Sequence, residues 1–424
     1  MIKRLLKHKM FKNTFVYVVT DIINKAIPFL LLPVLTRYLT PSDFGIIASF
    51  VTLVSFVGMF TGLNTHGAIS VNYFKDSKEK FGIFLSNVLI ILLVATIITL
   101  LALFFLQPLI TEKFYIPSEW VFIALLIATS QFITTINLTL WIAEEKPKAY
   151  GIFQISQAFV LAFLALFLIV VLLMGWEGRF VAVAVSTVMF SLLSLRFVTQ
   201  YKHFKWKFDK EIIVDTLKFG IPLIPHSLGG WLRTGLDRLF LISMIGTTAT
   251  GIYSVGYQIG MIMGIIVMAF NKVWGPHLFK KLSDNPSFDE KKKLVLFTYG
   301  YFALVLSIAT VLQFLAPYLF GFFIDERFKD AAPIIGWVAF GYAFTGMYFM
   351  VGQYLFYVKK THYLAMATLA TAVLHAVVSY TLIKYNGTIG SAQATTISFG
   401  VNFFIIWYLG NKFYPMPWRL RNVN

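Results

Sequence analysis

Long runs of apolar residues alternate with short polar segments along almost the whole chain. The stretches Gly82 to Leu106 and Ala149 to Trp176 carry no charged residue. Runs of about 20 mostly apolar residues have the length that crosses a bilayer as a helix. The pattern predicts twelve transmembrane helices, at about 13–36, 43–64, 82–106, 119–142, 150–174, 180–195, 214–244, 248–273, 294–323, 333–357, 363–383 and 390–411.

The composition supports this assignment. Of the 424 residues, 58% are hydrophobic and 13% are charged, whereas soluble proteins carry about 25% charged residues. The loops between the predicted helices are short, so we expect no separate soluble domain. We therefore predict an all-α, multi-pass membrane protein. The basic N-terminal segment is expected to lead into the first spanning helix and not to be a cleaved signal peptide.

Lysine and arginine are distributed unevenly between the predicted loops. The N-terminus, alternate loops and the C-terminus together carry 25 of them, and the opposite set of loops carries 6. Because basic residues concentrate on the cytoplasmic side, both termini are predicted to be cytoplasmic. Topology thus accounts for the net charge of +17, and we expect no nucleic-acid partner.

The sequence lacks the common motifs of catalysis. It has no GxxxxGK[ST] loop, which would bind nucleotide phosphates, and no cysteine for thiol chemistry or a disulfide. No cluster of His, Asp and Glu has the spacing of metal ligands. Structural or surface roles are favoured for four scattered histidines, His226, His277, His362 and His375. We expect a protein that is not an enzyme and needs no cofactor or metal.

Two pairs of similar segments indicate an internal duplication. Tyr38–Ser49 resembles Met244–Val255 at an offset of 206 residues, and in the second pair Gly178 matches Gly390 at a similar offset. The predicted lobes of six helices each are 1–206 and 207–424. Two parallel lobes suit an alternating-access transporter with its substrate between them near the bilayer midplane.

Charged residues interrupt the first predicted helix of each half. The helix at 13–36 contains Asp21 and Lys25. The helix at 214–244 contains Arg233, Asp237 and Arg238. A charge near the bilayer centre costs roughly 2.5–3.5 kcal/mol on the insertion scale, so it is expected to face a protein interior or a wet cavity. The i,i+4 spacing would let Asp21 pair with Lys25, and Arg233 with Asp237.

The basic residues of these two helices favour an anionic ligand. A guanidinium fork matches phosphate oxygens, so Lys25, Arg233 and Arg238 are predicted to contact substrate in a cationic cavity between the lobes. Asp21 and Asp237 are predicted to form structural ion pairs, with ion coupling as the alternative. Helix kinks are expected at the prolines of the same helices, Pro28, Pro33, Pro222 and Pro225.

Two long stretches resemble a known family. Ala26–Phe50, with the sequence AIPFLLLPVLTRYLTPSDFGIIASF, and Leu217–Ile259, which ends in GIYSVGYQI, are similar to bacterial polysaccharide-exporting flippases. These are the O-antigen and capsule repeat-unit translocases of the Wzx type. They share a superfamily with MATE-type multidrug exporters and peptidoglycan-precursor flippases. The resemblance covers essentially the whole chain.

The resemblance implies a MATE-like, twelve-helix fold that moves an undecaprenyl-pyrophosphate-linked oligosaccharide across the bacterial cytoplasmic membrane. The implied partners are this lipid-linked oligosaccharide, the lipid bilayer, and a polymerase and chain-length regulator of the same pathway, with the chain functional as a monomer. Two alternatives stay open. A MATE-type cation-coupled exporter shares the fold, although an acidic cavity would suit its substrates better. A polysaccharide polymerase would need a larger external loop than IDERFKDAAP.

Overall fold

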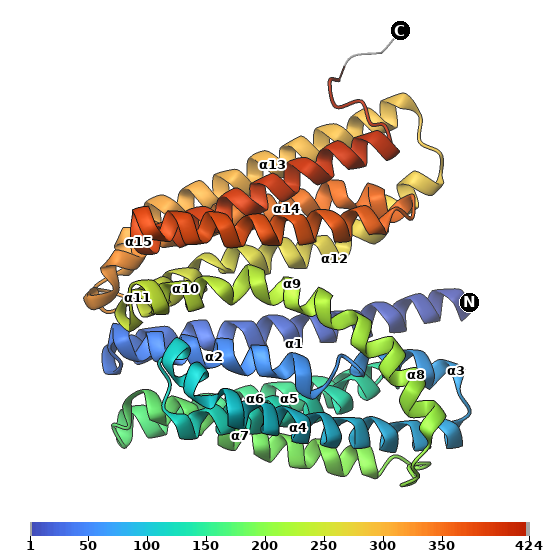
Figure 1. The fold of residues 1–424 in the computed structure, drawn as a ribbon. Coiled ribbons are helices and arrows are strands. Elements are labelled where there is room, and N and C mark those ends of the chain that lie inside the picture. The colour runs from blue at the N-terminus through green and yellow to red at the C-terminus, as the bar shows by residue number, and fades with distance from the viewer. Residues whose placement is uncertain (1, 421–424) are drawn as a thin grey trace. The chain divides into compact units, whose positions relative to one another are not determined.

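The computed structural model describes residues 2–420, without the side chains of residues 2–15, 18, 21 and 25. Long helices joined by short turns make up most of the described chain (Figure 1). The chain divides into two compact units, Met1–Trp231 and Leu232–Asn424. The division falls within a single helix, α9 (Ile224–Thr234).

Unit 1 is built around α5. Its elements before α9 are α1 (Ile2–Tyr38), α2 (Pro41–Thr61), α3 (His66–Lys75), α4 (Lys78–Phe114), α5 (Ser118–Ala143), α6 (Pro147–Leu166), the π-helical turn η1 (Phe167–Val171), α7 (Gly175–Thr199), α8 (Lys210–Gly220) and the 3-10 turn η2 (Ile221–Leu223). Helix α5 contacts α2, α3, α4, α6 and α7. Phe50 of α2 stacks on Phe180 of α7 with ring centroids 3.8 Å apart, and Trp120 of α5 lies edge-on to Phe180. Aromatic packing thus joins three helices of the unit.

The start of α2 follows directly from the residues TPSD. Thr40 is the N-cap, and its side chain accepts a hydrogen bond from the Asp43 backbone N–H at 3.2 Å. The Asp43 carboxylate in turn accepts from the Thr40 N–H at 2.8 Å. Pro41 occupies the first helical position, where a backbone N–H would have no acceptor within the helix, so its absence costs no hydrogen bond. This reciprocal capping fixes the helix start and is worth about 1 kcal/mol.

Unit 2 is built around α14. Its elements after α9 are α10 (Leu236–Met244), α11 (Thr247–Gly260), α12 (Ile262–Ser283), α13 (Phe288–Leu315), the 3-10 turns η3 (Ala316–Leu319) and η4 (Glu326–Ala331), α14 (Ala332–Tyr357) and α15 (Thr361–Phe413). Helix α14 contacts α11, α12, α13 and α15. Tyr354 of α14 and Phe403 of α15 are among the largest side chains that are fully buried. The core of the unit therefore lies along the length of α14.

The two units share features at the positions of the predicted repeat. Helix α2 begins at Pro41 and α11 begins at Thr247, so the offset of 206 residues is preserved. Gly175 and Gly387 both have φ = +60°, a left-handed conformation that favours glycine. The non-helical Gly387 divides α15 into two helical parts, as predicted from the apolar runs. The same positive φ at matching places supports a duplication.

Gly390 packs closely against the backbone of the first part of α15. We therefore expect a larger side chain at this position to destabilise the protein. A Cβ at this position would lie 2.0 Å from the Leu382 carbonyl oxygen. The substitution Gly390→Ala is therefore expected to lower the free energy of unfolding by about 1–3 kcal/mol. Gly300→Ala in α13 is the matched control, because a Cβ there meets no atom within 4 Å. Thermal unfolding in one detergent checks the pair, and equal melting temperatures would contradict the prediction.

Nine helices within residues 2–420 are long and apolar enough to cross a membrane. The predicted helix at 214–244 is not one of them, because the chain there is divided into α8, η2, α9 and α10. Helix α8 packs on α3 and α4, and Ser227 of α9 donates a hydrogen bond to Asn64 at 3.1 Å. The segment 207–231 thus lies in unit 1, whereas the lobes predicted from sequence divide at residue 206.

Candidate functional site

The charged residues of the predicted seventh helix lie on either side of a break at Gly235. Arg233 is in the last turn of α9, and α10 begins at Leu236, so that Asp237 and Arg238 lie in its first turn. The i,i+4 rule for charge pairs applies within one continuous helix. Arg233 and Asp237 lie in different helices, so the rule does not apply to them.

Asp237 lies in the interior of unit 2 with 1% of its surface exposed. Its carboxylate accepts hydrogen bonds from Ser379 Oγ at 2.5 Å, Tyr253 OH at 2.9 Å and Thr395 Oγ1 at 3.3 Å. These hydroxyls come from α11 and from both parts of α15. Isolated carboxylates are strongly disfavoured in an apolar interior, so this set of donors compensates for lost water.

His375 of α15 completes this cluster. It is fully buried, and its Nε2 lies 3.1 Å from Asp237 Oδ1. Its Nδ1 lies 2.9 Å from Ser398 Oγ on the second part of α15. A carboxylate and an imidazole in contact can hold opposite charges, or can share one proton between them. The cluster therefore joins α10, α11 and both parts of α15 through one charged centre.

Arg233 and Arg238 lie against aromatic rings. The guanidinium carbon of Arg233 is 4.6 Å from the centre of the Phe399 ring, and that of Arg238 is 4.9 Å from the centre of the Tyr257 ring. Arg238 also donates a hydrogen bond to the Thr234 carbonyl at 2.5 Å. Both side chains are half-buried. Neither arginine forms an ion pair with a carboxylate in the described part of the chain.

The expected contact between Arg233 and Asp237 is thus absent in the described structure. Asp237 has the imidazole of His375 as its ionisable neighbour, and Arg233 packs on Phe399. The physical reason is the break at Gly235, together with the hydroxyl donors that surround the carboxylate. No carboxylate among the described residues therefore pairs with Arg233 or Arg238.

The other predicted site residues lie in α1 and around η2. The side chains of Asp21 and Lys25 lie outside the part of the chain that the structure describes, so their predicted ion pair stays a prediction. Pro28 and Pro33 are inside α1. Pro222 lies in η2, between α8 and α9, and Pro225 is the second residue of α9.

A structural role is among those that the sequence favours for His375, but the sequence does not predict its partner, Asp237. The residue is 138 positions from Asp237, and only the packing of α10 on α15 brings them together. One signal was available, since His375 and Ser379 are spaced i,i+4 in an otherwise apolar segment and so lie on one helix face. Both contact the same oxygen of Asp237.

Smaller polar residues join other helices. Asn24 of α1 donates a hydrogen bond to Gln154 of α6, and Gln353 of α14 donates to Asn271 of α12 at 2.9 Å. Such bonds between helices are typical of membrane proteins. Among the residues described, no group of three or more His, Asp or Glu side chains could hold a metal ion.

Solved structures share this fold. The lipid II flippase MurJ in an inward closed conformation superposes with a TM-score of 0.72 at 15% identity, covering 94% of this chain and 87% of that one. An inward-facing multidrug resistance MATE family transporter gives 0.71 at 15% identity, covering 92% and 94%. At these identities the likeness shows the fold alone. The fold is therefore MATE-like.

Sequence comparison decides the family. The family described as polysaccharide biosynthesis protein matches residues 10–281, which is more than half of the chain. The chain belongs to this family. The match includes both stretches, Ala26–Phe50 and Leu217–Ile259, that carry the resemblance to polysaccharide flippases, and it confirms that resemblance.

Curated relatives of this polysaccharide biosynthesis protein span nearly its full length. The "Lsg locus putative protein 1" of Haemophilus influenzae is 24% identical over 409 residues, covering 92% of this chain and 97% of the relative. The "Capsular polysaccharide biosynthesis protein CapF" of Staphylococcus aureus is 22% identical over 414 residues, covering 96% and 100%. The family and the apolar helices together identify a multi-pass membrane protein of polysaccharide biosynthesis.

Proposed function

We propose that the chain is a flippase for an undecaprenyl-pyrophosphate-linked oligosaccharide, such as an O-antigen or capsule repeat unit. It would move this substrate from the cytoplasmic to the outer leaflet of the bacterial cytoplasmic membrane by alternating access. Lys25, Arg233 and Arg238 are the proposed contacts of the anionic headgroup. Asp237 is proposed to form a structural ion pair with His375, with ion coupling as the alternative role, and Asp21 keeps the same two proposed roles.

One observation carries this proposal. Arg233 and Arg238 are half-buried guanidinium groups on aromatic rings, without a carboxylate partner among the described residues. Cations held inside a membrane protein mark a substrate or ion path, and guanidinium suits pyrophosphate oxygens in particular. Membership of the polysaccharide biosynthesis family supports a lipid-linked glycan as the source of that pyrophosphate.

The proposed topology has twelve crossings and two cytoplasmic ends. Dividing α15 at Gly387 and adding α1 and the α9–α10 segment would raise the nine apolar spans to twelve. An even number of crossings puts both termini on one side, and the distribution of Lys and Arg favours the cytoplasm. This topology also agrees with two parallel lobes of six helices each.

Leaflet exchange in proteoliposomes tests the proposal. Purified protein is reconstituted with a fluorescent undecaprenyl-pyrophosphate-linked oligosaccharide, and an impermeant quencher reports the fraction in the outer leaflet. We expect faster loss of the protected fraction than in protein-free liposomes. The same assay with an imposed pH gradient tests proton coupling. Folded protein that leaves the exchange rate at the protein-free level would refute the proposal.

A MATE-type exporter of small molecules is the second candidate, because the MATE transporter shares the fold equally well. Cationic drugs would require an acidic site, but the buried acid of unit 2, Asp237, is already matched by His375. Efflux of cationic dyes from the same proteoliposomes, without glycolipid exchange, would favour this candidate. A polysaccharide polymerase is the third and weakest candidate.

A further inference from the structure

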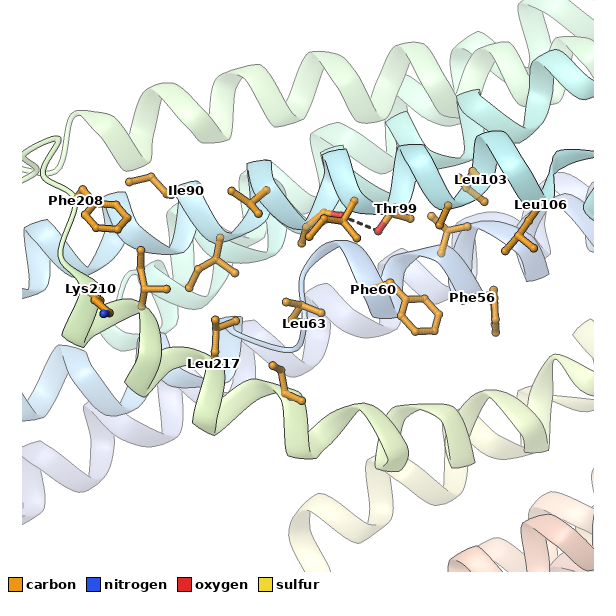
Figure 2. Close-up of a pocket in the computed structure, with 18 residues that line it drawn as sticks. Phe56, Phe60, Leu63, Ile90, Thr99, Leu103, Leu106, Phe208, Lys210 and Leu217 are labelled. Atoms are coloured by element: carbon orange, nitrogen blue, oxygen red, sulfur yellow. Dashed lines mark hydrogen bonds between the residues drawn. The ribbon is translucent and has the colours of Figure 1, made fainter.

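Unit 1 holds an elongated apolar groove of about 680 Å³ (Figure 2). Its walls come from Phe56–Phe60 of α2 and Leu63 just after it, Ile90–Leu106 of α4, and Phe208–Ile221 of α8, η2 and the preceding linker. We name it the α2–α4–α8 groove. Several of its residues are exposed, among them Ile98 at 62%. The groove is therefore an open surface that lipid can enter, not a closed void.

The groove is almost purely apolar along its length. Only Thr99 and Lys210 among its lining residues have polar side chains. The Thr99 hydroxyl donates a hydrogen bond to the Ala95 carbonyl at 2.7 Å, within its own helix. Lys210 is thus the one lining side chain that offers a polar group to a ligand. Figure 2 shows Lys210 and Phe208 at one end of the groove and Leu106 at the other.

The end that contains Lys210 is anchored firmly to α4. Asn87 donates a hydrogen bond to the Lys207 carbonyl at 2.9 Å, and its side-chain oxygen accepts one from the Asp209 N–H at 2.9 Å. Trp206 and Phe208 beside it are 65% and 67% exposed. Exposed aromatic residues next to lysines are typical of the headgroup level of a bilayer. We therefore expect this cation at the level of the lipid phosphates.

The groove is longer than one leaflet. Its α4 wall runs from Ile90 to Leu106, which at 1.5 Å per residue is roughly 24 Å. The hydrocarbon core of a bilayer is about 30 Å thick, so one leaflet contributes about 15 Å. A phospholipid acyl chain of one leaflet would fill only part of the groove, whereas a polyprenyl chain is long enough to fill all of it.

We propose that the α2–α4–α8 groove binds the polyprenyl chain of the lipid-linked substrate, with Lys210 next to its pyrophosphate. The inference rests on the proposed function, which supplies the lipid, and it adds a site for the tail. An anionic head joined to a long apolar chain matches a single cation at the mouth of a long apolar groove. The tail is then guided along unit 1 and does not move freely in the bilayer.

Filling the groove tests this site. Ala102 is a small, exposed lining residue of α4, so Ala102→Trp occupies the groove without disturbing a core. The adjacent Leu101 is 57% exposed and lies outside the groove, so Leu101→Trp is the matched control. Flipping is measured with undecaprenyl and with geranyl carriers of the same oligosaccharide. We expect Ala102→Trp to slow the undecaprenyl substrate by about tenfold, equivalent to losing roughly two buried CH₂ groups. The geranyl substrate should be unaffected, and Leu101→Trp should leave both rates unchanged.

The head end has its own pair of variants. Lys210→Gln is expected to weaken binding of undecaprenyl phosphate by about tenfold, the loss of one charge-assisted contact. Lys205→Gln, which changes a linker lysine outside the groove, should have no effect. Equal effects of both variants would mean general surface charge and would overturn the assignment of Lys210.

Photo-crosslinking keeps the proposal testable with the unaltered protein. A diazirine-bearing undecaprenyl phosphate should label the α4 segment 90–106, and unlabelled undecaprenyl phosphate should compete with it. Competition by phosphatidylglycerol to the same degree would mean an ordinary lipid contact and would overturn the inference. Flipping of neither carrier by wild-type protein would instead refute the proposed function. Flipping of both carriers at rates that Ala102→Trp leaves unchanged would refute the groove alone.

Discussion

Arg233→Ala is expected to lower the rate of lipid-linked oligosaccharide flipping by about 10- to 100-fold. A hydrogen bond to a charged group contributes about 1.5–3 kcal/mol, and alanine removes the entire guanidinium fork. The free energy of unfolding should fall by only about 0.5–2 kcal/mol, because the contact that Arg233 makes within the protein is a cation–π contact with Phe399. Initial rates in proteoliposomes, normalised to folded protein, measure the effect.

Two further variants show whether the guanidinium itself matters. Arg233→Lys keeps the charge but lacks the planar pair of donors, so we expect an intermediate rate. Arg327→Ala removes an arginine that pairs with Asp325 at 2.8 Å, far along the chain, and should leave flipping unchanged. Wild-type rates for Arg233→Ala would assign Arg233 to packing against Phe399 alone.

His375→Leu is expected to destabilise the protein by about 3–5 kcal/mol. The substitution leaves the buried Asp237 carboxylate with hydroxyl donors but without its charged neighbour, and an uncompensated buried charge is costly. Chemical or thermal unfolding in detergent measures the loss. His362→Leu, at an exposed histidine near the start of α15, is the control and should change stability little.

The double variant Asp237→Asn/His375→Leu separates charge from packing. Removing both charges should restore most of the stability that His375→Leu loses, because no unpaired carboxylate is then buried. A double variant as unstable as His375→Leu would contradict the ion-pair account. The two proposed roles of Asp237 differ in transport. A folded Asp237→Asn that flips normally fits a structural role, and one that no longer responds to a pH gradient fits coupling.

Local sequence patterns were sufficient to predict most of the helices. The apolar run at 82–106 lies within α4 and that at 119–142 within α5, because a helix that crosses a bilayer is apolar both where it faces lipid and where it packs on other helices. The helix predicted at 43–64 likewise corresponds to α2, which begins two residues earlier, at Pro41, after the capping residue Thr40. These features depend on residues close together in the chain, so a single sequence contains the necessary information.

The contacts of the candidate site depended on tertiary packing and could not be predicted in the same way. The i,i+4 rule predicted that Asp237 would pair with Arg233, yet the side chain that contacts its carboxylate is His375 on α15. The segment 214–244 read as one apolar helix, although it contains three breaks, between α8, η2, α9 and α10. The prolines and glycines in that segment predict a bend. The contacts of the side chains around the bend, however, depend on the neighbouring helices.

Helix α9 also holds the connection between the two units. Its first part is tied to unit 1, since Ser227 bonds to Asn64 and Trp231 donates to the Thr52 carbonyl at 3.2 Å. Two residues after Trp231, the Arg233 side chain packs on Phe399 of unit 2. The covalent joint between the units thus lies within one turn of a helix. The proposed anion contact, Arg233, is two residues from the point where the chain passes from one unit to the other, so the proposed substrate site and the connection between the units share the same turn of α9.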